Sequence, residues 1–299
     1  MKKMLRYLIP LGFSGVLLVS HALAELRIAT YNVENYLIMD RRVGERWQPG
    51  YPKPEHEKAM IRQIITDAAP DILALQEMGP PEFLAELRRD LADAGLDYPH
   101  TVHLSGRDPD RHLAVLAKVA PTEVVRHTDL DFKYFDQREL VKRGMLELTF
   151  EDAAGQEFKL FVVHLKSKYT VNPEDPDSQL RRTREAEACR NRIIERTLER
   201  GVSRFLVTGD FNDHPDSAPL RRFYQRGDLE IGTRVPATDS RGEVWTYFYA
   251  KHGQYSLVDG FVASAAMLPL IRDGRGQIAD APGALEGSDH RMVYVDLVE

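Results

Sequence analysis

Short runs of apolar residues recur along the chain from residue 26 onwards, and each has the length of a buried β-strand bounded by turns. We expect strands in eight segments: Leu26–Thr30, Ile72–Gln76, Ala114–Ala117, Gly144–Phe150, Phe158–His164, Phe205–Thr208, Leu257–Val262 and Met292–Val298. Three further segments repeat apolar residues at helical spacing: Glu55–Ala68, Glu82–Ala94 and Ser178–Arg200. Pro54 and Ser178 are well placed to begin helices, and Gly201 to end one. Strands outnumber helices, and several neighbouring strands have no helix between them. The pattern therefore favours mixed sheets over a purely parallel, doubly wound sheet.

The first 24 residues follow a different pattern. A basic start leads into an apolar run over Leu8–Val19, and the segment closes with Ala22-Leu23-Ala24. This layout is typical of a secretory signal peptide, so we expect residues 1–24 to be removed and the protein to be periplasmic or secreted. The alternative is a retained N-terminal anchor, which Pro10 makes less favourable as a spanning helix. Residues 25–299 show no repeat and no low-complexity linker, and we interpret them as one domain.

The composition is that of an ordinary globular protein, and it restricts the chemistry. The chain has a single cysteine, which excludes an internal disulfide and a cysteine-rich zinc site. Cys189 falls on the apolar stripe of the third predicted helix, so we expect it to be buried by packing. The net charge is −6, from 40 Lys and Arg against 46 Asp and Glu. Binding of a phosphate substrate would therefore require local positive charge or a metal ion.

Polar side chains that suit catalysis follow the predicted strands at six places. They are Asn32, Glu77, His164 with Lys166, Asp210 with Asn212 and His214, Asp259, and Asp289 with His290 just before the last strand. Each one alone is typical of an ordinary turn or a solvated group. Together, carboxylates, amides and imidazoles at strand ends are the groups of a hard-cation site with acid–base partners. Other hydrolytic mechanisms lack their motifs, since the sequence has neither a Gly-x-Ser-x-Gly elbow nor a Walker A loop.

The order of these segments resembles a known family. The segments that carry the resemblance are Thr30–Asn35, Leu75-Gln76-Glu77, Val163–Lys168, Thr208–Asp213, Val258-Asp259-Gly260 and Ser288-Asp289-His290. They are similar to the motifs of the endonuclease/exonuclease/phosphatase superfamily, which has the deoxyribonuclease-I-like fold, and the likeness extends from Leu26 to Leu297. The resemblance implies an α/β fold: a four-layer α/β/β/α sandwich of two mixed β-sheets flanked by helices.

The resemblance also implies a metal site and the groups that act on phosphate. Glu77 would be the main Mg²⁺ ligand, with Asn32 and Asp289 beside it, and Mn²⁺ is the alternative ion. Asp210 and Asn212 would orient the attacking water and the scissile phosphate.

Two histidines complete the implied catalytic set. His290 would be paired with Asp259 and act as a general base, or else stabilise charge on the phosphate. His164 matches the second imidazole of the deoxyribonuclease I branch, which contacts the phosphate or protonates the leaving oxygen. Because imidazoles titrate near neutrality, one could accept a proton and the other donate one. The assignment of each role stays open at this point.

Basic residues near these motifs are candidates for binding substrate. Arg111 precedes the strand where the family often carries a phosphate contact, although an exposed turn explains it equally well. Lys166 belongs to the His164 motif. Arg182 lies at the end of an apolar helical stripe, where it either reaches the substrate phosphate or extends its head to water. The long connection from Tyr36 to Lys53 is rich in arginine and aromatic residues, which suits base stacking, or it is a mobile solvated loop.

Three functions remain in competition. The motifs and the export signal favour a metal-dependent nuclease acting on DNA, and on RNA as a second substrate. The same fold would also serve a phospholipid, sphingomyelin or inositol-phosphate phosphoesterase, for which the aromatic segment Trp245–Tyr249 could supply membrane contact. A non-catalytic binding module is the third, and the complete set of motif residues argues against it. We expect nucleic acid as the partner, no stable protein partner, and no membrane span after signal cleavage.

Overall fold

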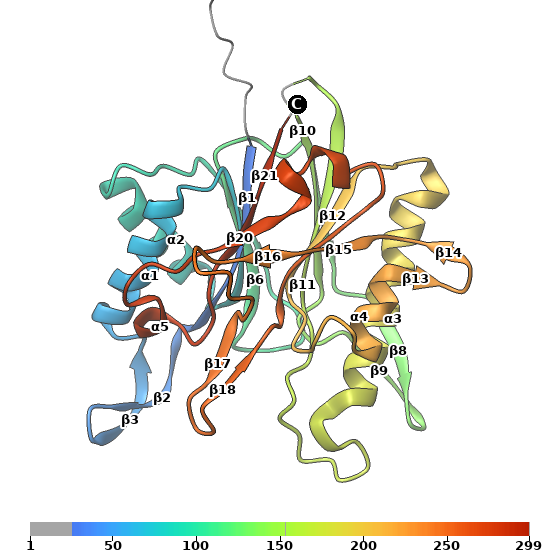
Figure 1. The fold of residues 1–299 in the computed structure, drawn as a ribbon. Helices are drawn as coiled ribbons and strands as arrows, with labels where there is room; N and C mark the ends of the chain where they lie inside the picture. The colour runs from blue at the N-terminus through green and yellow to red at the C-terminus, as the bar shows by residue number, and fades with distance from the viewer. Residues whose placement is uncertain (1–25, 153, 299) are drawn as a thin grey trace, which may run out of the picture.

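The computed structural model describes residues 26–152 and 154–298, which form two stacked β-sheets with helices on both outer faces (Figure 1). The predicted signal peptide, residues 1–24, lies outside the described residues. Among the described residues, no helix is long and apolar enough to cross a membrane.

The first sheet has seven strands and contains both chain ends of the described region. Its order is β16 (Ala237–Thr238), β20 (Gly276–Ile278), β21 (Val293–Leu297), β1 (Leu26–Tyr36), β4 (Ile72–Met78), β6 (His112–Ala117) and β5 (His100–Leu104). The central strand β1 pairs with β4 in parallel and with β21 in antiparallel orientation, so the sheet is mixed.

The second sheet has six strands. Its order is β15 (Thr233–Val235), β19 (Asp259–Ala263), β12 (Phe205–Asp210), β11 (Glu157–His164), β10 (Met145–Glu151) and β7 (Glu123–His127). Here β11 and β12 are parallel and their neighbours are antiparallel. Four ribbons of two strands extend from the sandwich: β2–β3 (Ile38–Val43, Arg46–Pro52), β8–β9 (Asp131–Tyr134, Gln137–Leu140), β13–β14 (Gln225–Arg226, Leu229–Glu230) and β17–β18 (Tyr247–Tyr249, Gln254–Ser256).

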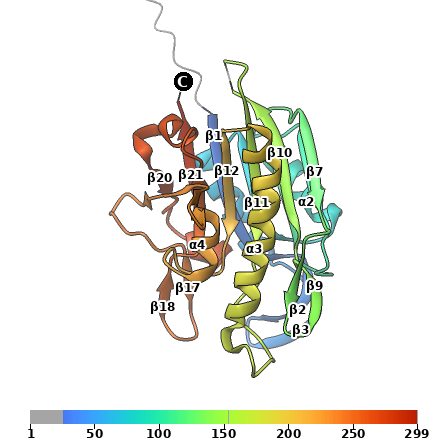
Figure 2. The same ribbon diagram turned by 90° about the vertical axis from the view of Figure 1, so that its right-hand side faces the viewer.

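Helices cover each sheet on its outer face, which gives four layers. The first sheet carries α1 (Glu55–Ala68), α2 (Pro81–Asp93) and α5 (Ala284–Gly287), and the second carries α3 (Gln179–Arg196) and α4 (Ala218–Tyr224). Figure 2 shows α3 lying along the face of the second sheet. Short 3₁₀ turns occupy Pro176–Ser178, Leu198–Arg200, Leu268–Leu270 and Arg272–Gly274. One apolar core lies between the sheets, and a separate core lies beneath each helical layer. The predicted α/β/β/α sandwich of two mixed sheets is confirmed.

The predicted elements are all present, with small shifts at their ends. Helix α1 matches its prediction, whereas the third predicted helix divides into α3 and a 3₁₀ turn that ends at Gly201. The start of α3 is capped differently from our prediction. The Asp175 carboxylate accepts the backbone N–H groups of Leu180 and Arg181, while the Ser178 side chain makes no capping bond. Cys189 is fully buried, as predicted.

The connection from Tyr36 to Lys53, interpreted from the sequence as a long loop, is instead a β-hairpin. Strands β2 and β3 pair across a tight turn at Gly44, whose φ of 60° suits glycine. Arg41 donates to the backbone carbonyls of residues 35 and 37 and so braces the hairpin against β1. Trp47 is 67% exposed. The hairpin forms a two-stranded sheet of its own and is mostly exposed along its length.

Candidate active site

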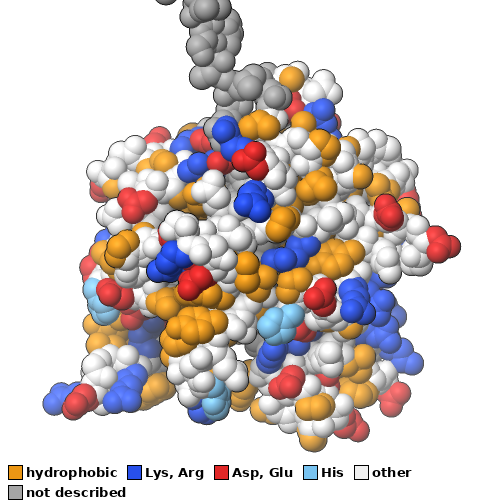
Figure 3. All heavy atoms as spheres, viewed as in Figure 1, with side chains coloured by type: hydrophobic (Ala, Val, Ile, Leu, Met, Phe, Trp, Pro, Cys, Tyr) orange, Lys and Arg blue, Asp and Glu red, His pale blue; other side chains and the backbone are white. Residues whose placement is uncertain are grey.

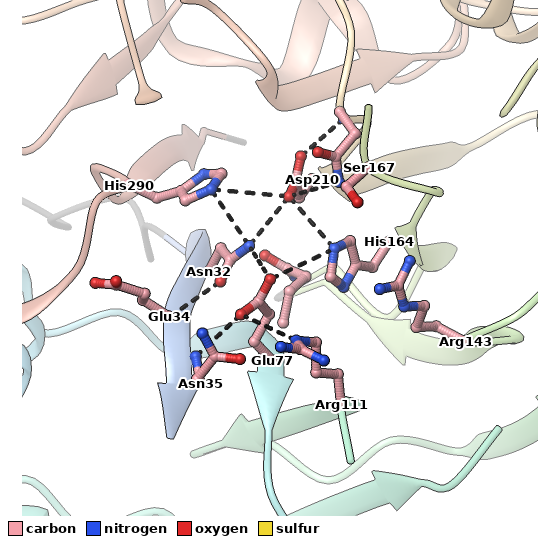
Figure 4. A network of polar contacts seen from close by, with 12 residues as sticks. Asn32, Glu34, Asn35, Glu77, Arg111, Arg143, His164, Ser167, Asp210 and His290 are labelled. Carbon is pink, nitrogen blue, oxygen red and sulfur yellow. Dashed lines mark hydrogen bonds and ion pairs between the residues drawn. The ribbon is translucent and has the colours of Figure 1, made fainter. Parts of the chain in front are cut away.

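The register of the strands brings the predicted catalytic residues to one edge of the sandwich. On the second sheet, Asp210 at the end of β12 is paired with His164 on β11 and with Asp259 on β19. On the first sheet, Asn32 on β1 lies opposite the residue that precedes Glu77 on β4. The Asn32 amide nitrogen donates to Asp210 Oδ2 at 3.0 Å, which joins the two sheets directly (Figure 4).

Close approach of β11 and β12 explains the glycine that precedes Asp210. Gly209 has a φ of +137°, and a Cβ atom there would lie 1.9 Å from the carbonyl oxygen of Val163. A larger residue would therefore push the two strands apart just where His164 and Asp210 are paired. This is the physical reason for glycine in the Gly-Asp-Phe-Asn segment.

His290 forms a buried pair with Asp259. Its Nδ1 lies 2.8 Å from Asp259 Oδ2, and the Asp259 backbone N–H donates to Thr246 Oγ1 at 3.0 Å. The ring of Tyr247 packs against the imidazole at 4.7 Å between centroids. Burial alone would lower the pKa of His290, but the charges of Asp259 and Asp210 raise that pKa well above its usual value. The pairing predicted for His290 and Asp259 is therefore present in the structure.

His164 has the opposite environment. Its Nε2 lies 3.4 Å from Asp210 Oδ2 and 3.9 Å from Glu77 Oε1, while its Nδ1 has no hydrogen-bond partner among the described residues. Burial, followed by the positive charge of Arg143, lowers the pKa of His164 well below its usual value. The two imidazoles are thus held with pKa values shifted in opposite directions, an arrangement that separates acid and base roles.

Asp210 lies at the centre of the site and is held by two asparagines. Besides the bond from Asn32, the Asn212 backbone N–H donates to Asp210 Oδ1 at 2.8 Å and the Asn212 amide donates to Oδ2 at 3.0 Å. Asn212 has a φ of 55°, so its backbone is in the left-handed region that turns the chain back towards Asp210. Burial, and then the charge of Asp259, raise the pKa of Asp210 to about 7.

Three more carboxylates lie on the side of the first sheet. Glu77 has a φ of 61° at a bulge of β4, and its Oε2 accepts the backbone N–H of Asn35 at 3.0 Å. Glu34 Oε2 accepts the backbone N–H of Asp289 at 3.0 Å. Burial, together with the charges of Glu34 and Glu77, raises the pKa of Asp289 to about 8. This end of the cleft therefore gathers buried carboxylates that repel one another.

Comparison with known proteins agrees with this arrangement. The sequence pattern of the Endonuclease/Exonuclease/phosphatase family matches residues 29–290. The chain belongs to this family of phosphoric ester hydrolases. No curated protein matches the sequence.

Solved structures of the same fold come from bacteria and human. The endonuclease/exonuclease/phosphatase from Bacteroides vulgatus superposes with a TM-score of 0.63 at 17% identity, covering 92% of this chain and 100% of that one. The human Nocturnin catalytic domain gives 0.59 at 16% identity, with 91% and 93% covered. Sphingomyelinase C from Streptomyces griseocarneus gives 0.61 at 15% identity, with 92% and 99% covered. At these identities the likeness establishes the fold alone.

The endonuclease/exonuclease/phosphatase family depends on divalent metal ions, and the donors of this site suit a hard cation. Carboxylate oxygens converge here, and no cysteine is among the described residues that line the cleft. Among the described residues, Asp210, Asp259 and His290 form a group of possible ligands, with one candidate atom of each within 4.8 Å of the others. These atoms are close largely because Asp259 and His290 are hydrogen-bonded to each other. That bond already uses Asp259 Oδ2 and His290 Nδ1, which are then not available to a metal ion.

Of the three predicted metal ligands, Glu77 and Asp289 direct carboxylates into the cleft, and Asn32 differs. The Asn32 oxygen accepts the backbone N–H of Glu34 at 3.0 Å, and its nitrogen faces Asp210 and Glu77. In this structure the Asn32 amide nitrogen therefore stabilises the two carboxylates by hydrogen bonds, and its oxygen is turned towards the backbone of Glu34.

The cleft has a volume of about 670 Å³ and continues well beyond the carboxylates. Five cationic residues line it: Arg111, Lys142, Arg143, Lys166 and Arg181. Three tyrosines do so as well: Tyr134, Tyr169 and Tyr247. In the surface view, a histidine is visible in a hollow with acidic and basic side chains beside it (Figure 3).

The structure separates the predicted substrate-binding residues into two groups. Arg111 and Lys166 line the cleft, and Arg111 Nε lies 3.6 Å from Glu77 Oε2. Arg182 is 1% exposed, and its guanidinium donates to Asp213 at 2.8 and 2.9 Å and to the carbonyl of Lys166. The proposed contact of Arg182 with phosphate is wrong, because these buried partners use its donors, and the alternative of a solvated head is wrong as well.

Sequence reasoning missed several residues that line the cleft. Glu34 and Asn35 belong to a recognised motif, but only their left-handed backbone, with φ of 42° and 53°, brings both to the carboxylate group. Lys142, Arg143 and Arg181 lie in segments where charge is ordinary for a turn or helix surface. Conversely, no described residue of the hairpin β2–β3 lines this cleft.

Proposed function

We propose that this protein is an exported, divalent-metal-dependent phosphodiesterase that hydrolyses nucleic acid, with DNA as the main substrate and RNA as a second one. The observation that carries the proposal is the cleft itself. It joins a catalytic end rich in carboxylates and histidines to a longer part lined by cations and tyrosines. Cations attract a phosphate backbone, and the exposed ring of Tyr169 can stack on a base, so the combination suits a polynucleotide.

The residues that would hold the metal are Glu77 and Asp289, with Glu34 close by. When bound, a Mg²⁺ or Mn²⁺ ion would lower the pKa of a bound water and stabilise negative charge on the phosphate. It would also relieve the repulsion that raises the pKa of Asp289 and Asp210.

The protein's own groups would then align the reaction. Asp210 and Asn212 orient the attacking water and the scissile phosphate. His290, held by Asp259 through Nδ1, directs its Nε2 towards Asp210 and would accept the proton of that water there. His164, kept neutral by its surroundings, donates a hydrogen bond from Nε2 to a phosphate oxygen on the other side of Asp210.

A lipid substrate is the second candidate, and one surface feature favours it. The ribbon β17–β18 lies beside His290 and exposes Tyr249 and Tyr255, at 38% and 57%. Aromatic side chains of this kind contact membrane interfaces. One structure of similar fold is a sphingomyelinase. Against a lipid substrate, the five cations that line the cleft would repel the positively charged choline of sphingomyelin.

A panel of substrates tests the proposal. Purified protein lacking residues 1–24 is incubated with plasmid, single-stranded DNA, RNA and sphingomyelin vesicles, each with Mg²⁺, Mn²⁺ or chelator. We expect metal-dependent cleavage of the nucleic acids and no release of phosphocholine. Cleavage of sphingomyelin without cleavage of nucleic acid would overturn the assignment in favour of the lipid reading.

A further inference from the structure

A group of three cations lies in the cleft on the side of His164, and one buried carboxylate organises it. Glu185 on α3 is fully buried, and its oxygens accept the backbone N–H of Lys166 at 2.8 Å and of Lys142 at 3.4 Å. The Arg181 Nε lies 3.5 Å from the same carboxylate. Glu185 therefore holds two loops and a helix together, so that Lys142, Lys166 and Arg181 line one part of the cleft.

The positive charge of Lys142 and Lys166 is incompletely neutralised, whereas Arg181 is paired with Glu139 and lies 3.5 Å from Glu185. Lys166 Nζ donates to Ser167 and to the carbonyl of Tyr169, and no carboxylate lies within 4.0 Å of it among the described residues. Lys142 Nζ is 3.9 Å from Asp108, which is bound more closely by Arg143 at 3.0 Å. Burial, and then the neighbouring cations Arg143 and Lys142, lower the pKa of Lys166 to about 8. A bound anion would relieve this repulsion.

The position of the group relative to the catalytic residues indicates which anion it would take. Arg111 and Arg143 lie nearest to Glu77 and His164, where the scissile phosphate must sit (Figure 4). Lys142, Lys166 and Arg181 line the same continuous cleft beyond them, beside Tyr134, whose ring packs under the Arg181 guanidinium at 5.4 Å. A substrate with a single phosphate would leave Lys142 and Lys166 without an anion of the substrate, whereas Arg181 already has Glu139 as a partner.

We infer that Lys142, Lys166 and Arg181 form a subsite for a second phosphate of the same substrate, the phosphodiester next to the one that is cleaved. The inference rests on the proposed nuclease function and makes it more specific. A dinucleotide, with one phosphodiester, is then a poor substrate, whereas a trinucleotide occupies both positions. Phosphate contacts of this kind fix the register of a strand without reading its bases.

The test compares substrates that differ in the second phosphate. Hydrolysis of a thymidine dinucleotide, the same dinucleotide with a terminal phosphate, a thymidine trinucleotide and bis(p-nitrophenyl) phosphate is measured for wild type and Lys142→Ala. The Lys142 side chain is 40% exposed, so its removal leaves the packing intact. We expect wild type to prefer the trinucleotide over the dinucleotide in kcat/KM, and Lys142→Ala to reduce that preference about tenfold, mainly through KM.

The matched control is Lys133→Ala, an exposed lysine on β8 outside the cleft, which should leave every rate unchanged. An equal loss for all four substrates, or an unchanged preference in Lys142→Ala, would overturn the subsite. If the terminal phosphate alone restores the full preference, a phosphomonoester and not the neighbouring phosphodiester is its ligand, which contradicts the inference in its stated form.

Failure of the proposed function has a different outcome. Wild type would then hydrolyse none of the four substrates in the presence of metal. Binding of a fluorescent trinucleotide, followed by anisotropy at several salt concentrations, still decides the subsite. Lys142→Ala should weaken binding and reduce its dependence on salt, because one phosphate contact is lost. Equal affinity and equal salt dependence in both proteins would contradict the subsite by this second route.

Discussion

Two regions of this protein bury ionisable groups, and they do so in opposite ways. Beneath α3, on the second sheet, Glu147 accepts bonds from His127, Lys159 and Arg196, all between 2.8 and 3.0 Å. We refer to these four residues as the paired cluster. Burial would raise the pKa of Glu147, but the bonds from His127, Arg196 and Lys159 outweigh it and lower that pKa to about 2.

The active-site cleft lacks this balance. Its carboxylates face one another, and burial with mutual repulsion raises the pKa of Asp210 to about 7 and of Asp289 to about 8. In the paired cluster, side chains of the protein itself neutralise the buried carboxylate. At the carboxylate end of the cleft, the repulsion between the acids is left for a bound cation to relieve. Burial of charge alone therefore does not mark a functional site; unbalanced charge does.

The largest effect is expected from removal of the His290 imidazole, which is hydrogen-bonded to Asp259. His290→Ala should reduce turnover about 10³- to 10⁴-fold, because the general base is lost, and should also lower the melting temperature, because Asp259 loses its buried partner. Initial rates on DNA, with thermal denaturation in parallel, measure both. His56→Ala, an exposed histidine on α1, is the control and should keep the wild-type rate. Substantial activity in the His290 variant would remove the basis of the proposed mechanism.

The paired cluster should show the reverse behaviour, a loss of stability without loss of chemistry. Glu147→Gln leaves Lys159 and Arg196 without their buried counter-charge, so the free energy of unfolding at pH 7 should fall by about 3 kcal/mol. A carboxylate with a lowered folded pKa stabilises the fold above its unfolded pKa. The contribution is then lost as the pH falls from the unfolded value of 4.5 to about 2.

Urea denaturation of wild type and Glu147→Gln across this pH range measures the difference. The two proteins should converge in stability towards pH 2. Glu230→Gln, which changes an exposed acid on β14, controls for the loss of one charge. A difference that stays constant with pH would show that Glu147 acts through packing and not through its charge.

A smaller effect on turnover is expected at the second histidine. His164→Ala should lower kcat about 10²-fold, since it removes a hydrogen bond to phosphate while leaving Glu77 and Asp289 in place. The Mg²⁺ concentration for half-maximal rate should stay close to that of wild type. Wild-type turnover in this variant would make His164 structural, and a large shift in the Mg²⁺ dependence would place it with the metal ligands.

The sequence was sufficient to predict the sandwich and the catalytic group, because both depend on local pattern. Apolar runs predict the strands, and a polar residue at the end of a run must lie at the end of its strand. The register of neighbouring strands then places such residues side by side, as with His164 and Asp210. Arg182 could not be assigned this way, since its partner Asp213 comes from another segment that only the fold brings near. The hairpin β2–β3 was missed because its mostly polar residues carry no alternating apolar pattern.

Lys166 was predicted from its motif, but Lys142 and Arg181, the other two cations of the proposed subsite, were missed for a related reason. The three cations come from different segments and meet because one buried residue, Glu185, accepts the backbone N–H groups of Lys142 and Lys166 and lies 3.5 Å from Arg181 Nε. A buried acid in the middle of a helix gives no indication of this in the sequence. Residues that are brought together by a shared partner can therefore be identified only from the structure, whereas residues at strand ends can be identified from the sequence.

The central claim is that the unbalanced carboxylates of the cleft bind the divalent cation that hydrolysis requires. The most direct measurement is the melting temperature of wild type and Glu77→Gln in Mg²⁺ and in chelator, with activity followed on the same samples. Wild type should melt at a higher temperature in Mg²⁺, by linkage of binding to folding, and should be active only there. In Glu77→Gln the rise should be much smaller and the activity should need more Mg²⁺. An equal rise in both proteins, or full activity of wild type in chelator, would contradict the account.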